Sequence, residues 1–285
     1  MSTSLALQLF SLANELRQDL EGTLAAVAAI GFRHVELAGL LGRDAASLAG
    51  ALRAAGLECH SAHVPLKPYR PSGDPSLQDL AGLVEAAGRL GLRDIIVPMF
   101  PLPERAGGPA AGESVEGYFT RAAAMIGADD WKALAALLNQ NARTLALHGL
   151  GFGYHNHNVE FARCGETTGY EILIEHTDPA LVHFELDVGW ARAAGLDPAA
   201  LLRRHPGRFR WLHLKDLAAT TPCNTRFQLH PADLGTGLID WTALLHAAAD
   251  LGIHQLVVER EPPFSEPPLL TIEQHWRFLS DRLPA

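Results

Sequence analysis

Cysteine is scarce in this chain, and long hydrophobic runs are missing. Its 285 residues include 3 cysteines, and their positions form no paired spacing. A disulfide-stabilised scaffold is therefore excluded. No apolar run approaches the roughly 20 residues that cross a bilayer. The apolar stretch Leu5–Phe10 lacks a preceding basic segment and is too short for a signal-peptide core. We expect a cytoplasmic protein with no membrane partner.

Positive charge is also in short supply. Lys and Arg number 23 against 32 Asp and Glu, which gives a net charge of −9. An acidic surface repels phosphate backbones, and the sequence contains no compensating basic cluster, so no nucleic-acid partner is expected. With 48% hydrophobic and 19% charged residues, the chain has enough apolar material for a large core and is not disordered.

The dinucleotide-binding glycine fingerprint is absent from the segment Phe10-Ser11-Leu12-Ala13-Asn14. That absence disfavours an open doubly wound sheet. The chain instead alternates short apolar runs with Ala/Leu-rich helical stretches, and no linker divides it. Eight such units in a chain of this length predict an α/β fold, a single-domain (β/α)8 TIM barrel over residues 1–285. The predicted strands are Leu5–Phe10, His34–Ala38, Leu57–Val64, Asp94–Phe100, one within Thr144–His157, Leu181–Asp187, Phe209–Lys215 and Gln255–Glu259. The predicted helices are Leu20–Ile30, Asp44–Ala55, Ser76–Leu90, Arg121–Asn141, Thr168–Glu175, Pro198–Arg204, Ile239–Leu251 and Thr271–Leu279.

Two long loops interrupt this alternation. Pro101–Gly117 is rich in Gly, Pro and Ala, and Thr220–Gly237 separates the seventh predicted strand from its helix. A long loop after a barrel strand is typical of the catalytic face, although a plain surface excursion fits as well. Gly235-Thr236-Gly237 lacks the Lys of a phosphate-binding loop. It predicts a tight turn into the next helix.

Four strands in the second half of the chain end in carboxylates or imidazoles. Because side chains alternate along a strand, His183, Glu185 and Asp187 share one face. Burying three ionisable groups against the helices would be costly, so we expect this face to point into the barrel. Asp187 stands last, where the loops begin, and we expect it to bind a metal. His183 and Glu185 are expected to form a satisfied pair beneath it. His213 and Glu259 end the next two strands and are candidate ligands beside Asp187.

The fifth strand is ambiguous. His155 and His157 share a face, Asn156 faces away, and Glu160 lies just beyond. The two imidazoles could bind one ion, or one group could be the ligand while the others contact substrate.

Further polar groups lie at or near the strand ends. Lys215 shares a face with His213 and could contact a substrate oxygen or stabilise an enolate; a salt bridge to Asp216 or an acidic neighbour is the alternative. Glu261 is expected in solvent or paired with Arg260. Groups that could support the site or contact substrate are Gln8, Glu36, His60 or His63, and Met99.

Mixed carboxylate and imidazole ligands suit one divalent ion of Mn, Co, Mg, Fe or Zn. None of the candidate ligands is a cysteine, which disfavours a structural zinc site. No organic cofactor site is indicated.

Five motifs together are similar to those of the sugar phosphate isomerase/epimerase family of the xylose isomerase-like barrels. The resemblance covers nearly the whole chain and implies a TIM barrel with one divalent metal bound by Asp187, His213 and Glu259. Many relatives carry a glutamate where this chain has His155, so either His155 or Glu160 is the fourth ligand; we favour Glu160. The motifs are Tyr154-His155-Asn156-His157 with Glu160-Phe161, Leu186-Asp187-Val188-Gly189-Trp190, Leu212-His213-Leu214-Lys215-Asp216, Gly235-Thr236-Gly237-Leu238-Ile239-Asp240-Trp241 and Val258-Glu259.

The implied activity is isomerisation or epimerisation of a sugar or sugar-derived ketone through an enediolate. Glu259 or Glu160 would move the proton, with His155 and Lys215 as further catalytic groups and His63, His157 and Gln8 as substrate-binding groups. The alternative is a dehydratase or lyase on an inosose- or 3-keto-sugar-type substrate. A repair endonuclease is disfavoured by the acidic charge, and a non-catalytic sugar-binding barrel by retention of all candidate ligands. The expected partner is a small carbohydrate; a homo-oligomer is an open alternative.

Overall fold

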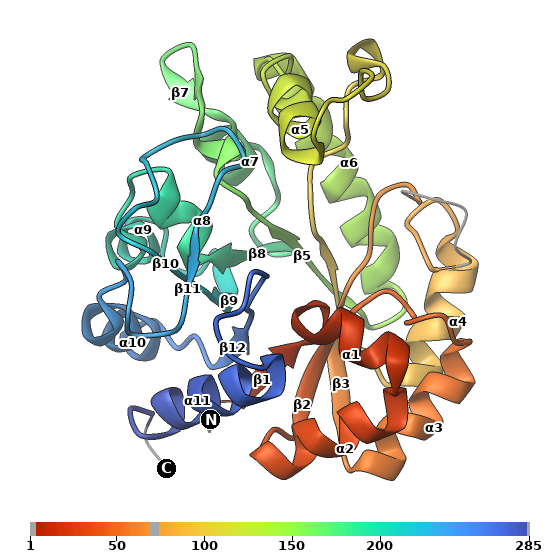
Figure 1. Cartoon of the computed structure of the whole chain (residues 1–285). Coiled ribbons are helices and arrows are strands. Elements are labelled where there is room, and N and C mark those ends of the chain that lie inside the picture. Colours follow the sequence, from red (N-terminus) through yellow and green to blue (C-terminus); the bar gives the residue numbers. More distant parts are fainter. Residues whose placement is uncertain (1–3, 69–73, 284–285) are drawn as a thin grey trace.

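Eight parallel strands close into a barrel in the computed structural model, which describes residues 4–68 and 74–283 (Figure 1). The strand β1 pairs with both β2 and β12, so the sheet has no free edge. The predicted single-domain TIM barrel is confirmed. In chain order the barrel strands are β1 (Ser4–Gln8), β2 (His34–Ala38), β3 (Glu58–His63), β4 (Asp94–Val97), β5 (Gly151–His155), β8 (Val182–Asp187), β9 (Phe209–Leu214) and β12 (Gln255–Val258).

Helices cover the outside of the barrel, and their ends follow local signals. Asp44, for example, precedes its helix and accepts hydrogen bonds from the amides of Ala46 and Ser47, and Gly56 ends that helix at a φ of 73°. None of the helices in the described residues is long and apolar enough to cross a membrane. The helices are α1 (Ala13–Gln18), α2 (Leu20–Ile30), α3 (Ala45–Ala55), α4 (Leu80–Leu90), α5 (Val115–Ala123), α6 (Ala128–Ala146), α7 (Gly169–His176), α8 (Val188–Ala193), α9 (Pro198–Arg204), α10 (Trp241–Asp250) and α11 (Pro268–Ser280).

Short elements decorate the loops. Three 3-10 helices and two small antiparallel strand pairs lie outside the barrel sheet. They are η1 (Leu9–Leu12), η2 (Glu104–Ala106), η3 (Val159–Phe161), β6 (Arg163–Cys164) with β7 (Thr167–Thr168), and β10 (Asp216–Leu217) with β11 (Pro231–Ala232).

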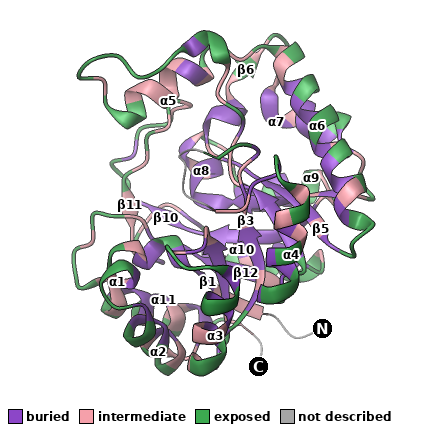
Figure 2. Cartoon of the chain, turned by 90° about the vertical axis from the view of Figure 1, so that its right-hand side faces the viewer, coloured by how far each residue is buried: buried purple, intermediate pink, exposed green. Residues whose placement is uncertain are grey.

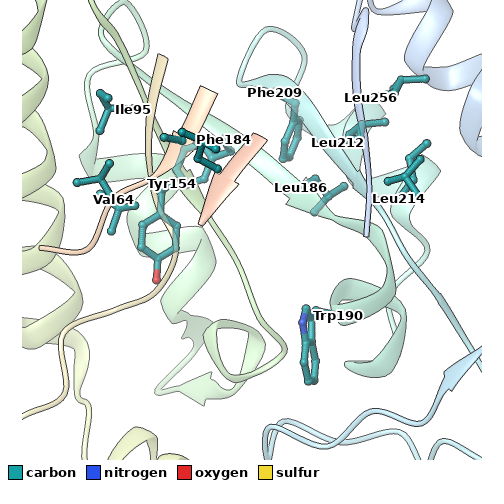
Figure 3. Close-up of a cluster of buried hydrophobic side chains, with 14 of the residues drawn as sticks. Val64, Ile95, Tyr154, Phe184, Leu186, Trp190, Phe209, Leu212, Leu214 and Leu256 are labelled. Atoms are coloured by element: carbon teal, nitrogen blue, oxygen red, sulfur yellow. The ribbon is translucent and has the colours of Figure 1, made fainter. Parts of the chain in front are cut away.

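The main core lies between the strands and the helices. Leu212 sits opposite both Leu186 and Leu256 in the strand register, and all three side chains are buried among apolar neighbours (Figure 3). Because strand side chains alternate, the residues that follow them, Asp187 and His213, face the barrel interior. This alternation is what directs the candidate ligands inward.

Several predicted boundaries were wrong. The first strand ends at Gln8 instead of Phe10, because the Gln8 side chain accepts the Phe10 amide and starts a 3-10 turn. The helix predicted over Arg121–Asn141 is two helices, α5 and α6, and α5 begins inside the predicted loop. Since α6 continues to Ala146 and β5 ends at His155, His157 lies in the turn after β5.

Asp216 organises the turn that precedes α10. Its carboxylate is fully buried and accepts six hydrogen bonds, five of them from main-chain amides. The predicted tight turn is confirmed: its amide groups bond to Asp216 and are not available to a phosphate. The donors are the amides of Leu217, Gly235, Gly237, Leu238 and Ile239, and the indole of Trp241.

A buried histidine on α11 should make stability depend on pH. Burial lowers the pKa of His275 from 6.5 to about 4, although Asp233 opposes the shift, and its Nε2 accepts the Leu234 amide. Between pH 6.5 and 4 the unfolded chain therefore binds a proton that the folded protein does not, and stability falls with falling pH. We expect the free energy of unfolding to fall by up to about 3 kcal/mol over this pH range, and this fall to be absent from the His275→Asn protein. Urea unfolding of both proteins at pH 7.5 and 5 compares their pH dependence. An equal change with pH in the two proteins would contradict the prediction. Exposed His148→Asn is the matched control.

Candidate metal centre and active site

The candidate residues converge at the carboxyl ends of four barrel strands. His155 and Asp187 are the last residues of β5 and β8, Lys215 directly follows β9, and Glu259 directly follows β12. One ligand atom each from Asp187, His213 and Glu259 lies within 4.8 Å of the others. This end of a TIM barrel is where catalytic groups gather.

The carboxylate of Asp187 is fixed in place with one oxygen spare. The residue is fully buried, and its Oδ1 accepts the Trp190 amide at 2.8 Å, which caps α8. Asn156 accepts the Asp187 amide at 3.1 Å and so holds the backbone. Oδ2 has no hydrogen-bond partner among the described residues, although the Lys215 ammonium lies 3.2 Å away. This oxygen is aimed at the space between the candidate ligands.

His213 is held by a buried carboxylate on its far side. Its Nδ1 is 3.2 Å from Glu259 Oε2, and its Nε2 is 2.8 Å from Glu36 Oε1. Glu36 also accepts from Gln8 Nε2 at 2.9 Å and from Ser61 Oγ at 2.6 Å. A histidine that donates one N–H to a carboxylate presents its other nitrogen as a ligand. The bond to Glu36 therefore leaves Nδ1 to face Glu259.

The charged groups around His213 and Glu36 shift the pKa values of both side chains. Burial alone would lower the pKa of His213, but the nearby Glu185, Glu259 and Glu36 carboxylates raise it well above its ordinary value. Burial alone would raise the pKa of Glu36, yet the charge of His63 and the hydrogen bond from His213 bring it down to about 2. Without a metal ion, a protonated imidazole therefore sits between carboxylates.

Another buried carboxylate, that of Glu185, lies two residues before Asp187 on β8 and so deeper in the barrel. Its Oε2 is 2.8 Å from His63 Nε2 and 2.9 Å from His155 Nδ1. Burial, together with the charge of Glu36, raises the pKa of Glu185 to about 7. The predicted pairing of Glu185 with His183 is wrong, because the His183 ring packs near Trp211, with ring centroids 6.4 Å apart. Glu185 orients His155 instead.

Lys215 joins three acidic residues. Its side chain is 1% exposed, and its ammonium lies 3.2 Å from Asp187 Oδ2, 2.8 Å from Glu259 Oε2 and in contact with Glu261. Burial alone would lower the pKa of Lys215, but these carboxylates raise it well above its ordinary value. These carboxylates therefore favour the charged form of the Lys215 side chain. Glu261 was expected in solvent or paired with Arg260; its side chain is 32% exposed but pairs with Lys215, and Arg260 pairs with Asp233 instead.

Two predicted site residues lie away from the cluster. Glu160 is fully buried, and its two oxygens accept from the Tyr154 hydroxyl and the His157 amide, each at 2.9 Å. Burial raises the pKa of Glu160 to about 7. These bonds hold the turn after β5 and leave Glu160 outside the converging ligand groups, against our preference for it as a ligand. Gln8 is fully buried and bonds to Glu36 and the Phe10 amide, so its expected contact with substrate is not supported.

A cavity of about 470 Å³ opens directly above these groups, and His63, His155, His157, Lys215 and Glu259 line it. His157 is a neutral member of this set, because burial and the charge of Lys215 lower its pKa to about 3. Its Nδ1 is buried without a partner in the described structure. A neutral imidazole beside a charged ammonium can bond to a sugar hydroxyl.

The cluster fits a divalent cation. Four carboxylates are at most 6% exposed here, those of Glu36, Glu185, Asp187 and Glu259. Lys215 faces Asp187 and Glu259, and His213 lies between Glu259 and Glu36. The carboxylates outnumber these two cationic groups, and a bound cation would offset the excess of buried negative charge. The spare Oδ2 of Asp187 and the oxygen and nitrogen donors suit the metals expected from the sequence.

Sequence reasoning missed two asparagines of the turn after β5. Asn156 was expected to face away from the site, yet it binds the backbone of Asp187 through both of its amide atoms. Asn158 is fully buried and anchors the loop around Asn224 and Phe227. The sequence did contain one signal for them: two asparagines stand close together directly after a strand, and buried amide groups need hydrogen-bond partners.

Comparison with known proteins identifies the family. A family model described as xylose isomerase-like TIM barrel matches residues 24–282. The chain belongs to the xylose isomerase-like TIM barrel family. Among solved structures, a sugar phosphate isomerase/epimerase from Parabacteroides distasonis superposes with a TM-score of 0.74 at 22% identity, covering 98% of this chain and 94% of that chain. The 3-keto-D-glucoside 4-epimerase of E. coli superposes with a TM-score of 0.62 at 16% identity, covering 98% and 100%.

A curated relative is similar over a shorter stretch. The inosose dehydratase of Geobacillus kaustophilus is 35% identical over 88 residues, which are 31% of this chain and 28% of that protein. The chain therefore matches less than a third of that relative's length. The two structural neighbours support the xylose isomerase-like fold, and all three names belong to enzymes.

Proposed function

We propose that this protein is a divalent-metal-dependent isomerase or epimerase that acts on a sugar or sugar-derived ketone through an enediolate. Asp187, His213 and Glu259 would hold the metal, and His155 would complete the set from β5, since its Nε2 lies 3.8 Å from Asp187 Oδ2. The bound ion would supply Lewis-acid stabilisation of a carbonyl and its adjacent hydroxyl. The observation that carries the proposal is the convergence of these donors from four strand ends, directly beside a cavity that two of them, His155 and Glu259, line.

The chain's own groups can move the proton and stabilise the charge that develops. The carboxylate of Glu259 bonds to His213 and Lys215 through Oε2, which leaves Oε1 to take a proton from the carbon next to the carbonyl. The carboxylates around Lys215 favour its charged form, and because Lys215 lines the cavity it can donate to the enediolate oxygen. His157 would orient a sugar hydroxyl. Return of the proton to the neighbouring carbon gives isomerisation, and delivery of a proton by a second group to the opposite face of the same carbon gives epimerisation.

Proton exchange in D2O tests this proposal directly. The metal-loaded protein is incubated with a panel of ketoses and 3-keto-glucosides and followed by proton NMR. We expect one carbon-bound proton next to the carbonyl to exchange as an isomer or epimer forms. A panel in which no substrate exchanges such a proton argues against enolisation.

A dehydratase is the second candidate, and the similarity to inosose dehydratases favours it. The same first step, proton removal next to a carbonyl, leads to loss of a β-hydroxyl instead of proton return. The same NMR experiment separates the two, because a dehydratase gives a new alkene signal and an isomerase or epimerase gives none.

Replacing Lys215 should affect metal binding and turnover in opposite directions. Lys215 contacts Asp187 and Glu259, the two carboxylates assigned to the metal, and like charges repel. Lys215→Met should therefore bind the metal about tenfold more tightly while turnover falls by about 10²–10³, as for loss of one oxyanion donor. Metal titration and turnover at saturating metal measure the two effects. Weaker metal binding in the variant would contradict the assignment.

A further inference from the structure

The cavity has two unlike parts. Its inner part is polar and contains Lys215, Glu259, Glu261 and the histidines described above, whereas the rest of its lining is mostly apolar, with Asp74 as the one charged residue there among those described. A volume of about 470 Å³ falls within the range of pockets for drug-sized ligands and exceeds what one sugar ring requires. The outer part is lined by Phe10, Met99, Phe119 and Phe227, together with Pro65, Pro68, Pro75 and Pro98.

Phe227 is held rigidly in the wall of this outer part. Its φ of 59° is a left-handed conformation that a bulky residue adopts only where its surroundings hold it. The fully buried Asn158 provides that support: its Oδ1 accepts the Phe227 amide at 3.0 Å, and its amide group donates to Asn224. Thr120 on α5 also donates to the carbonyl of Arg226. The wall is therefore built before any ligand arrives.

Aromatic rings run continuously from the polar floor to the cavity mouth. Phe227 stacks on His157 with ring centroids 4.7 Å apart, and on Phe119 with centroids 5.2 Å apart and an interplanar angle of 18°. Trp190 lies 5.3 Å from both His157 and Phe227, and Figure 3 shows it standing apart from the strand core. Phe119 comes from α5, a mostly half-buried helix beyond the barrel strands (Figures 1 and 2).

The charges in the cavity disfavour a phosphorylated ligand. Among its described lining residues, Lys215 is the one Lys or Arg, and three carboxylates already surround its ammonium. Phosphate recognition uses arginine forks, lysines or helix N-termini that are free to donate. A neutral ligand fits these surroundings better than an anionic one.

We propose that the outer part of the cavity is a subsite for an apolar, ring-sized substituent on a neutral sugar, bound against Phe227 and Phe119. This inference rests on the proposed function, in that the polar floor would hold the sugar itself. It specifies the substrate class as glycosides with an apolar aglycone, in preference to free sugars or sugar phosphates. Stacking of a ring on a fixed aromatic wall adds affinity beyond the area that it buries.

Binding of unreactive glucosides tests the subsite without turnover. Calorimetry on the metal-loaded protein compares phenyl β-D-glucoside, methyl β-D-glucoside and glucose 6-phosphate. We expect the phenyl glucoside to bind at least about tenfold more tightly than the methyl glucoside, and the phosphate no more tightly than the methyl glucoside. Phe119→Ala should reduce the phenyl preference to about threefold or less, while Phe119→Leu should retain part of it. Val115→Ala, a 73% exposed position on the same helix, should leave it unchanged.

The possible outcomes separate the subsite from the proposed reaction. Equal affinity for the two glucosides, no measurable binding of either, or tightest binding of the phosphate overturns the subsite. A phenyl preference that Phe119→Ala leaves intact overturns the assignment to this wall. A phenyl preference in a protein that exchanges no substrate proton in D2O supports the subsite and contradicts the proposed reaction.

Discussion

The Asp187→Asn and His213→Ala proteins should purify without their divalent metal and without activity. Each change removes one of the converging donors, and Asp187→Asn also removes a charge from the cluster while keeping an oxygen that can accept the Trp190 amide. We expect metal affinity to fall by more than the roughly 10–100-fold that loss of a supporting group costs. Elemental analysis of purified protein, followed by metal titration, measures the effect.

Glu160→Gln is the matched control for the metal site. Glu160 bonds to Tyr154 and the His157 amide and lies outside the ligand groups, so this variant should keep its metal, whereas His155→Ala should bind it more weakly. If Glu160→Gln lost the metal and His155→Ala kept it fully, the fourth ligand would be Glu160 and not His155. Full stoichiometry in both Asp187→Asn and His213→Ala would refute the site itself.

Asp216→Ala should be among the most destabilising single substitutions in this protein. It removes a fully buried acceptor from six donors, and the amides of Gly235, Gly237 and Ile239 in the turn before α10 would lose this acceptor. Loss of a buried network of this kind costs about 3–5 kcal/mol in the free energy of unfolding. Urea denaturation at constant metal concentration measures the change.

Asp240→Ala provides the comparison for Asp216. Asp240 also accepts a main-chain amide, that of Ala243, but as a single N-cap bond at an exposed position. Its loss should cost about 1 kcal/mol. A cost for Asp216→Ala no larger than that of Asp240→Ala would show that the turn is held by other contacts.

The sequence was sufficient for the barrel and for the convergence of Asp187, His213 and Glu259. Strand alternation decides which side chains face inward, and closure of eight parallel strands brings their carboxyl ends together. The same reasoning failed for His183 and Glu185, because residues two apart on one strand are separated by about 6–7 Å along it. Cross-strand neighbours lie closer, and the register places Glu185 beside His155.

Loop geometry could not be predicted in the same way. The positions of Glu160 and Phe227 depend on how the chain turns after β5 and after β10, and those turns are fixed by tertiary bonds to Tyr154 and Asn158. Spacing in the sequence carries no information on such bonds. The aromatic wall therefore becomes visible only in three dimensions, although each of its residues can be seen in the sequence.

The supporting groups and the candidate ligands come from opposite halves of the chain. Gln8, Glu36, Ser61 and His63 belong to the first three strands, whereas the candidate ligands span 155 to 259. A chimera that joins the first half of one relative to the second half of another would keep all four metal donors. It would exchange Glu36 and its hydrogen-bond partners behind them, together with Phe10, Met99 and Phe119 of the cavity wall. Recombination of half-barrels is thus a route by which such proteins could retune metal affinity while conserving the coordinating atoms.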